Sequence, residues 1–213
     1  MKDIVKDIVE DIAGVQDTPE SWPVAATEPI LKHWLITVRS DKVQMPDKNF
    51  AERTVVSHPG AVAVLALDDA NRVLMIRQYR HPVGYQLWEI PAGLRDVDGE
   101  PLLATAQREL REETGYQARE WHVLVDTFTS PGFTTERIRI FLARGVQPAA
   151  DTGYVRHDEE KFLVAKWVPL DETVRLALAG KLHNGQTISA VLAAHAAQAT
   201  GFETLRPADA PET

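Results

Sequence analysis

Short runs of β-branched and aromatic residues dominate the middle of the chain, and this pattern predicts strands that are buried on at least one face. Gly, Pro, Asn and Asp separate most of the runs, as expected for turns between strands. The runs lie at residues 34–38, 51–56, 61–67, 73–79, 123–128, 138–143 and 162–168. The sequence therefore predicts a mostly β chain.

Helical periodicity interrupts the predicted strands in a few places. Leu103, Ala106 and Leu110 form one apolar stripe and predict a helix over residues 102–114. Two Ala- and Leu-rich segments near the C-terminus predict packing helices, the first with Asp171 as its cap and the second after the Asn184-Gly185 turn. They cover residues 171–179 and 186–199. Strands and helices together predict an α+β layered fold.

The two ends of the chain differ in composition from its middle. Residues 1–14 show an amphipathic pattern that predicts a docking helix or a frayed arm, and residues 16–29 are rich in Pro, Thr and Glu, as a linker would be. Residues 202–213 are predicted to be frayed. These patterns divide the chain into a helix and linker (1–29), N-terminal strands (30–58), a main domain (59–201) and a tail (202–213).

Composition narrows the class of protein. A chain of 213 residues with 44% hydrophobic content can bury one sizeable core. Its net charge of −8 disfavours binding to nucleic acid, which depends on neutralising phosphates with Lys and Arg. There is no Cys to form disulfides, no apolar stretch of the ~20 residues that span a membrane, and no apolar signal-peptide core at the N-terminus. We therefore expect a cytoplasmic protein that does not bind membranes.

The helix predicted over residues 102–114 carries an unusual set of charges. Glu109, Glu112 and Glu113 follow one another at i, i+3 and i+4 and therefore share one face. One interpretation is a solvated helix with Arg108–Glu112 pairing. However, like charges at i, i+4 cost roughly 0.2–0.5 kcal/mol, and a bound divalent cation would reverse that sign. Carboxylate oxygens and the absence of Cys favour Mg²⁺ or Mn²⁺ over zinc, and such cations most often serve phosphate chemistry.

The spacing of these acids resembles the Nudix box, the signature of hydrolases that cleave a nucleoside diphosphate linked to another group. A chance match to its specified positions is on the order of 10⁻⁸ per start. One departure is visible, since six residues separate Gly93 from Glu100 where the usual box has five. We interpret residues 96–99 as a lengthened turn. The role of Glu100 stays open. The positions are Gly93, Glu100, Arg108, Glu109, Glu112, Glu113 and Gly115.

The resemblance extends to the ADP-ribose pyrophosphatase branch of the family. Pro131 lies sixteen residues beyond Gly115, a spacing typical of that branch. Four short segments also agree with it, at residues 77–80, 87–93, 157–160 and 167–170. The resemblance implies a Nudix-type α/β/α sandwich with a mixed sheet over residues 59–201 and a small N-terminal β region. It also implies metal-dependent hydrolysis of ADP-ribose to AMP and ribose 5-phosphate. The alternatives are hydrolysis of another nucleoside diphosphate sugar, such as a GDP-sugar, and a non-catalytic Nudix module that binds a nucleotide.

The resemblance also assigns catalytic roles. It implies that Glu109, Glu112, Glu113 and the carbonyl of Ala92 bind Mg²⁺, with Mn²⁺ as the alternative, and that Glu113 belongs to the catalytic set. Arg108 would orient the glutamates through ion pairs. Glu160 best matches the base that activates water, and its neighbour Glu159 is the alternative.

The same family positions indicate how substrate would bind. Glu89 and Arg53 match residues that contact the adenosine portion, and Arg80 is a candidate for the phosphates. Trp34 could stack on adenine. Related enzymes exchange their N-terminal strands across a dimer, so the resemblance implies a homodimer in which Trp34 and Arg53 serve the partner's site. The terminal ribose would lie beside Pro131, Gly132 and Glu136.

Overall fold

A mixed sheet of five strands forms the centre of the main domain. The computed structural model describes residues 15–150 and 161–212, so the predicted N-terminal helix lies outside the described residues. Within the central sheet β4 and β10 are parallel, and the other neighbours are antiparallel. The order is β13 (Arg206–Pro207), β9 (Glu120–Phe128), β10 (Arg137–Arg144), β4 (Ala61–Ala66) and β7 (Ala92–Leu94).

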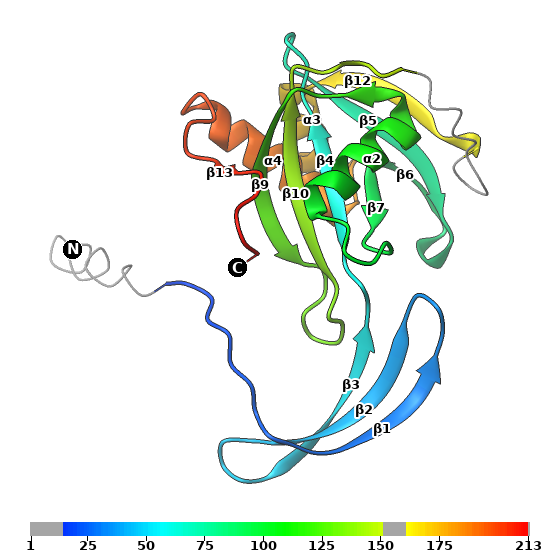
Figure 1. Cartoon of the computed structure of the whole chain (residues 1–213), viewed down its shortest axis with the longest axis vertical. Coiled ribbons are helices and arrows are strands. Elements are labelled where there is room, and N and C mark those ends of the chain that lie inside the picture. Colours follow the sequence, from blue (N-terminus) through cyan, green and yellow to red (C-terminus); the bar gives the residue numbers. More distant parts are fainter. Residues whose placement is uncertain (1–14, 151–160, 213) are drawn as a thin grey trace, which may run out of the picture.

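Helices cover both faces of this sheet (Figure 1). All of β4 is buried, as expected for a strand covered on two sides. Val62 and Val64 pack with α2, whereas Ala63 and Leu65 pack with α4, so alternate residues of one strand serve two apolar cores. The predicted α/β/α sandwich is therefore confirmed. The helices are α2 (Leu102–Thr114), α3 (Leu170–Leu178) and α4 (Gly185–Gln198).

A second antiparallel sheet of three strands lies beside the first. It has the order β12 (Val164–Pro169), β5 (Arg72–Arg80) and β6 (Tyr85–Glu89). A short 3-10 helix, η2 (His81–Val83), connects β5 to β6. The short strands β8 (Tyr116–Gln117) and β11 (Gln147–Pro148) pair with each other.

An antiparallel N-terminal sheet extends away from the main body (Figure 1). The expected linker over residues 16–29 is wrong in part, because β1 already begins at Val24. Pro29 is compatible with β1 because this strand lies at the edge of its sheet. The strand expected over residues 34–38 is also displaced, since residues 33–36 form the β1–β2 turn. The strands are β1 (Val24–Lys32), β2 (Thr37–Gln44) and β3 (Phe50–Ser57).

The helix ends follow the predictions closely. α2 covers the expected residues and ends at Thr114, and the following Gly115 caps it in the left-handed conformation with φ 74°. Asn184 caps α4, and its Oδ1 accepts a hydrogen bond of 2.8 Å from the backbone N–H of Thr187. The cap expected at Asp171 is wrong, because α3 begins one residue earlier, at Leu170, and its cap position is Pro169.

The C-terminal residues described, 202–212, are ordered, so the expectation of a frayed tail is wrong. The guanidinium of Arg139 on β10 is 3% exposed, and its two bonds to Asp126 leave further N–H groups to be paired. The tail supplies their acceptors, namely the carbonyls of Ala210 at 2.6 Å and Pro211 at 2.9 Å. Arg206 also binds Asp126, at 2.9 Å. A buried cation thus holds the tail against the sheet.

Deleting residues 209–213 should lower the free energy of unfolding by roughly 1–3 kcal/mol, because N–H groups of the buried Arg139 lose their carbonyl acceptors. In a chain of this size the midpoint of thermal unfolding should fall by about 2–4 °C per kcal/mol. Glu212→Gln removes only the more exposed ion pair with Arg95 and should change stability by less than about 1 kcal/mol. Equal unfolding midpoints for wild type and the deletion would contradict this role of the tail.

Candidate functional site

Two cavities meet at β7, the edge strand of the central sheet. The larger has a volume of about 520 Å³ and the smaller about 270 Å³. They share β7, which contributes Ala92, Gly93 and Leu94, and they share Arg80 from the end of β5. A single elongated ligand could therefore occupy both cavities.

The smaller cavity collects the acids of α2. Glu109, Glu112 and Glu113 all line it, so the structure brings together the carboxylates predicted to bind metal. Gly93 makes this possible, since a Cβ atom at that position would lie only 2.0 Å from Cδ of Glu109. Glu113 is 5% exposed, and its Oε2 accepts a hydrogen bond of 2.9 Å from the N–H of Ala92. The carboxylates of Glu109 and Glu113 thus form the contact between α2 and β7.

Arg108 lies among these acids. Its guanidinium donates to Glu109 at 2.6 Å and to Glu112 at 3.3 Å. It also holds both oxygens of Glu100, at 3.2 and 3.0 Å, and Thr105 Oγ1 donates to Glu100 at 2.9 Å. The hydrogen bond from Arg108 lowers the pKa of Glu100. Despite the lengthened turn before it, Glu100 therefore buttresses Arg108.

Arg108 compensates the negative charge of Glu109 only in part. Burial raises the pKa of its carboxyl group to about 7, and Arg108 offsets this only in part, while Glu112 and Asp96 raise it further. A carboxylate in this state is stabilised by an additional cation.

The donor set fits a hard divalent cation in its chemistry. Only carboxylate and carbonyl oxygens are offered, and the glycine at position 93 leaves room beside them. In the described arrangement, no three His, Asp or Glu side chains of residues 15–150 and 161–212 are grouped as metal ligands. Glu109 and Glu112 instead bind Arg108, so a cation would have to compete with that guanidinium.

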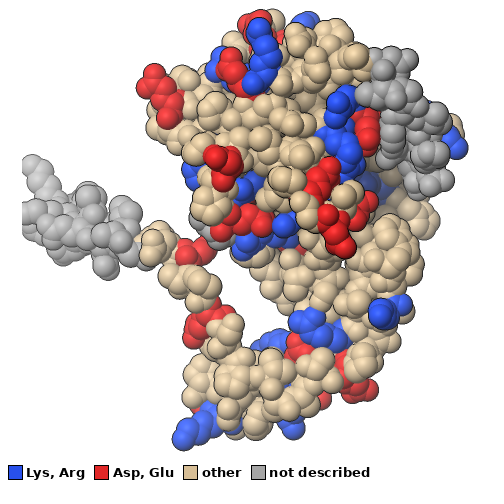
Figure 2. Space-filling view, viewed as in Figure 1, with Lys and Arg blue, Asp and Glu red and all other residues tan. Residues whose placement is uncertain are grey.

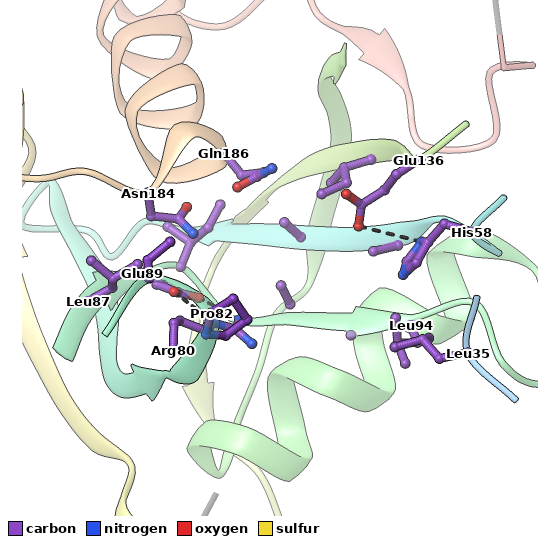
Figure 3. Close-up of a pocket in the computed structure, with 17 residues that line it drawn as sticks. Leu35, His58, Arg80, Pro82, Leu87, Glu89, Leu94, Glu136, Asn184 and Gln186 are labelled. Atoms are coloured by element: carbon purple, nitrogen blue, oxygen red, sulfur yellow. Dashed lines mark hydrogen bonds and ion pairs between the residues drawn. The ribbon is translucent and has the colours of Figure 1, made fainter. Parts of the chain in front are cut away.

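The larger cavity has one polar end at Arg80. Glu89 is 2% exposed and binds Arg80 through both oxygens, at 3.0 and 2.7 Å. Gln78 donates to the same carboxylate at 3.3 Å. Glu89 therefore fixes the orientation of Arg80, a role that the sequence did not indicate. Asn184 and Gln186 from the start of α4 line the same end (Figure 3), and sequence reasoning missed both.

The opposite end of the cavity carries His58 and Glu136 (Figure 3). Glu136 was predicted as a substrate residue, whereas Pro131 and Gly132 lie outside the cavity wall, in the turn that leads to it. His58 was missed, although the His58-Pro59-Gly60 turn directly before a buried strand was a usable signal. Between the two ends, Ala61 and Ala63 of β4 form part of the cavity wall.

Other predicted residues lie elsewhere. Trp34 is 79% exposed in the β1–β2 turn, and its neighbour Leu35, not Trp34, lines the larger cavity. Arg53 lies on β3 and donates to the carbonyl of Glu52 at 2.9 Å, away from both cavities. Glu159 and Glu160 lie outside the described residues.

The surface gives less information than the cavities. On the face shown in Figure 2, acidic and basic side chains are interspersed and do not separate into a single basic area. In the part of the chain that the structure describes, no helix combines the length and hydrophobicity needed to cross a membrane.

Comparison with known proteins gives consistent results. A model of the NUDIX domain matches residues 57–190. An ADP-ribose pyrophosphatase of Mycobacterium tuberculosis is 46% identical over 175 residues, which cover 82% of this chain and 83% of the relative. An ADP-ribose pyrophosphatase of Bacillus subtilis is 34% identical over 166 residues, 78% of this chain and 88% of the relative. A crystal structure of an ADP compounds hydrolase has the same fold, with a TM-score of 0.70 at 20% identity over 87% of this chain and 99% of that one.

The raised pKa of Glu109 predicts a pH effect on stability without metal. Because the folded state holds the proton up to about pH 7 and the ordinary value is 4.5, the free energy of unfolding should fall as pH rises from about 4.5 to 7. Glu109→Gln should reduce this fall and raise the thermal midpoint at pH 8 by about 2–4 °C, the shift produced by roughly 1 kcal/mol. Thermal unfolding at pH 5 and at pH 8, with a chelator present, measures this change in stability. Glu120→Gln, at an exposed site on β9, is the control; identical pH dependence in Glu109→Gln and wild type would contradict the prediction.

Proposed function

The chain belongs to the Nudix family of hydrolases, and from that premise we propose that it hydrolyses ADP-ribose to AMP and ribose 5-phosphate. The observation that carries the proposal is the identity with the mycobacterial ADP-ribose pyrophosphatase over most of both chains. The reaction adds water across the diphosphate, so that one P–O bond breaks and each product keeps one phosphate.

The shape of the site supports a substrate with a diphosphate at its centre. Ala92, Gly93 and Leu94 separate the carboxylate cavity from the larger one, and Arg80 stands at the same junction. A diphosphate placed there would meet the guanidinium of Arg80, which Glu89 holds in a fixed orientation. The larger cavity would then hold the groups attached to the diphosphate.

Nudix hydrolases need a divalent cation, and we assign Mg²⁺, with Mn²⁺ as the alternative, to Glu109, Glu112, Glu113 and the carbonyl of Ala92. When bound, the cation neutralises phosphate charge and makes a bound water easier to deprotonate. The residues of the chain prepare for this step. Glu113 is oriented by the N–H of Ala92, and Arg108 forms ion pairs with Glu109 and Glu112.

The base that activates water is assigned to Glu160, with Glu159 as the alternative. A positioned general base contributes roughly 10²–10⁴-fold to the catalytic constant. Of the remaining substrate candidates, Glu136 reaches the cavity from the loop that contains Pro131 and Gly132.

A substrate panel tests the proposed function. With Mg²⁺ present, wild type should convert ADP-ribose to AMP and ribose 5-phosphate with at least tenfold higher kcat/KM than GDP-mannose or ADP-glucose, equivalent to about 1.4 kcal/mol. Glu160→Gln should lower kcat with little change in KM, and a large loss of kcat in Glu159→Gln alone would move the assignment to Glu159. Equal efficiency on GDP-mannose would instead indicate a broad nucleoside diphosphate sugar hydrolase. Binding of ADP-ribose without any product would indicate a nucleotide-binding module.

The N-terminal sheet supports a homodimer. β1 is exposed along its whole length, and it presents Ile30 at 59% and Leu31 at 51% exposure, with Trp34 beyond its end. Exposed large apolar side chains gathered at the end of an edge strand are typical of an interaction site. A second copy would cover it and would bring Trp34 and Arg53 to a site that they do not reach within one chain.

We therefore expect a dimer in sedimentation velocity, and Ile30→Asp should shift the protein toward the monomer because it places a charge in the apolar contact. Leu178→Asp alters a still more exposed apolar side chain, at the end of α3, and should leave the dimer intact. A monomeric wild type at micromolar concentration would exclude this assembly.

A further inference from the structure

His58 is held rigidly at one end of the larger cavity. Its backbone N–H donates to Thr135 Oγ1 at 3.0 Å, and its ring Nδ1 accepts a hydrogen bond of 3.0 Å from the N–H of Gly60. Only 11% of the side chain is exposed. Because Nδ1 is the acceptor, the hydrogen of the neutral ring is on Nε2, which is thereby a donor.

The backbone around His58 is built to hold this ring. Gly60 has φ 89°, and a Cβ atom there would lie 3.0 Å from the carbonyl of Arg137, so only glycine fits the turn without strain. The loop that carries Glu136 is fastened to the end of β3, since Val56 donates to Phe133 at 2.7 Å and accepts from Thr135 at 3.0 Å. The His58 turn and the Glu136 loop therefore form one rigid wall.

Glu136 places an acceptor next to this donor. Its Oε2 accepts from Thr129 Oγ1 at 2.7 Å, which fixes the carboxylate, and its Oε1 lies 3.5 Å from Nδ1 of His58. In the neutral ring Nδ1 already accepts from Gly60, so Oε1 keeps its capacity to accept a hydrogen bond from a ligand. Figure 3 shows both side chains side by side at the end of the cavity opposite Arg80 and Asn184.

The rest of this end of the cavity is apolar. Leu35, Leu94 and Ile138 line it, and Ala61 lies between Ile138 and Leu94 in the sheet. A ligand group that enters would find one N–H donor and one carboxylate acceptor in apolar surroundings. A phosphate would be repelled by Glu136, whereas a pair of neighbouring hydroxyl groups can accept from Nε2 and donate to Oε1 at once.

We propose that His58 determines specificity by donating a hydrogen bond from Nε2 to a hydroxyl of a ribose diol whose other hydroxyl donates to Glu136. The proposal rests on the proposed function, because ADP-ribose supplies two such diols, one on the adenosine and one on the terminal ribose. Their shared chemistry fits the pair, and substrates that lack one diol distinguish them.

Two substitutions at position 58 distinguish the effect of the Nε2 donor from that of the Nδ1 acceptor. The amide oxygen of His58→Asn can still accept from Gly60, but its short side chain cannot replace Nε2. His58→Gln reaches further and places its amide N–H groups near the position of Nε2. His195→Asn makes the same change at an exposed site on α4 and is the matched control.

The experiment measures kcat/KM for ADP-ribose and for two analogues that carry a dideoxyribose, without the 2- and 3-hydroxyls, on either the adenosine or the terminal side. His58→Asn should lose about 3- to 10-fold on ADP-ribose, the contribution of one neutral hydrogen bond. On the analogue that lacks the diol bound by His58, wild type and His58→Asn should have the same kcat/KM. On ADP-ribose, His58→Gln should recover part of the kcat/KM that His58→Asn loses. Equal losses on all three substrates would show a merely structural role and overturn the proposal.

A binding measurement keeps this test separate from that of the proposed function. If wild type does not cleave ADP-ribose, calorimetry with AMP and with ribose 5-phosphate still tests the ribose contact. Weaker binding of either compound to His58→Asn than to His195→Asn would support the contact although the proposed function had failed. Equal binding of both compounds to the two variants would overturn it.

Discussion

The close approach of α2 to β7 is the contact on which the site depends. The carboxylate of Glu109 lies where any side chain at position 93 would be, and Glu113 accepts from the backbone of the neighbouring Ala92. Ala106 and Leu110 hold the other face of the helix in the core, so the acids cannot move outward without unpacking it. Apolar burial on one side of the helix thus keeps like charges together on the other.

This arrangement also explains how the protein tolerates the cluster without a cation. Arg108 contacts Glu100, Glu109 and Glu112 at once, which offsets part of their repulsion. The compensation is incomplete, as the raised pKa of Glu109 indicates. The cluster therefore keeps excess negative charge, which a bound cation would offset.

Local patterns in the sequence predicted the elements that depend on local interactions. The span of α2 and the buried run of β4 were both apparent from spacing and composition. Contacts between side chains far apart in the sequence could not be predicted from these patterns. The order of the tail depends on Arg139, whose acceptors lie some seventy residues away, and Glu89 could not be connected to Arg80 before the β5–β6 pairing was known. β1 was missed because its composition suits an exposed edge and a linker equally well.

β4 has a further consequence for how such enzymes can diversify. Ala61 and Ala63 face the larger cavity, while Val62 between them packs beneath the helix that carries the acids. Two methyl groups thus form part of the cavity wall, on a strand whose opposite face supports the helix with the acids. A larger residue at either alanine would reshape the cavity and leave the opposite face untouched. One strand would thereby let the shape of the cavity change while the helix with the acids keeps its packing.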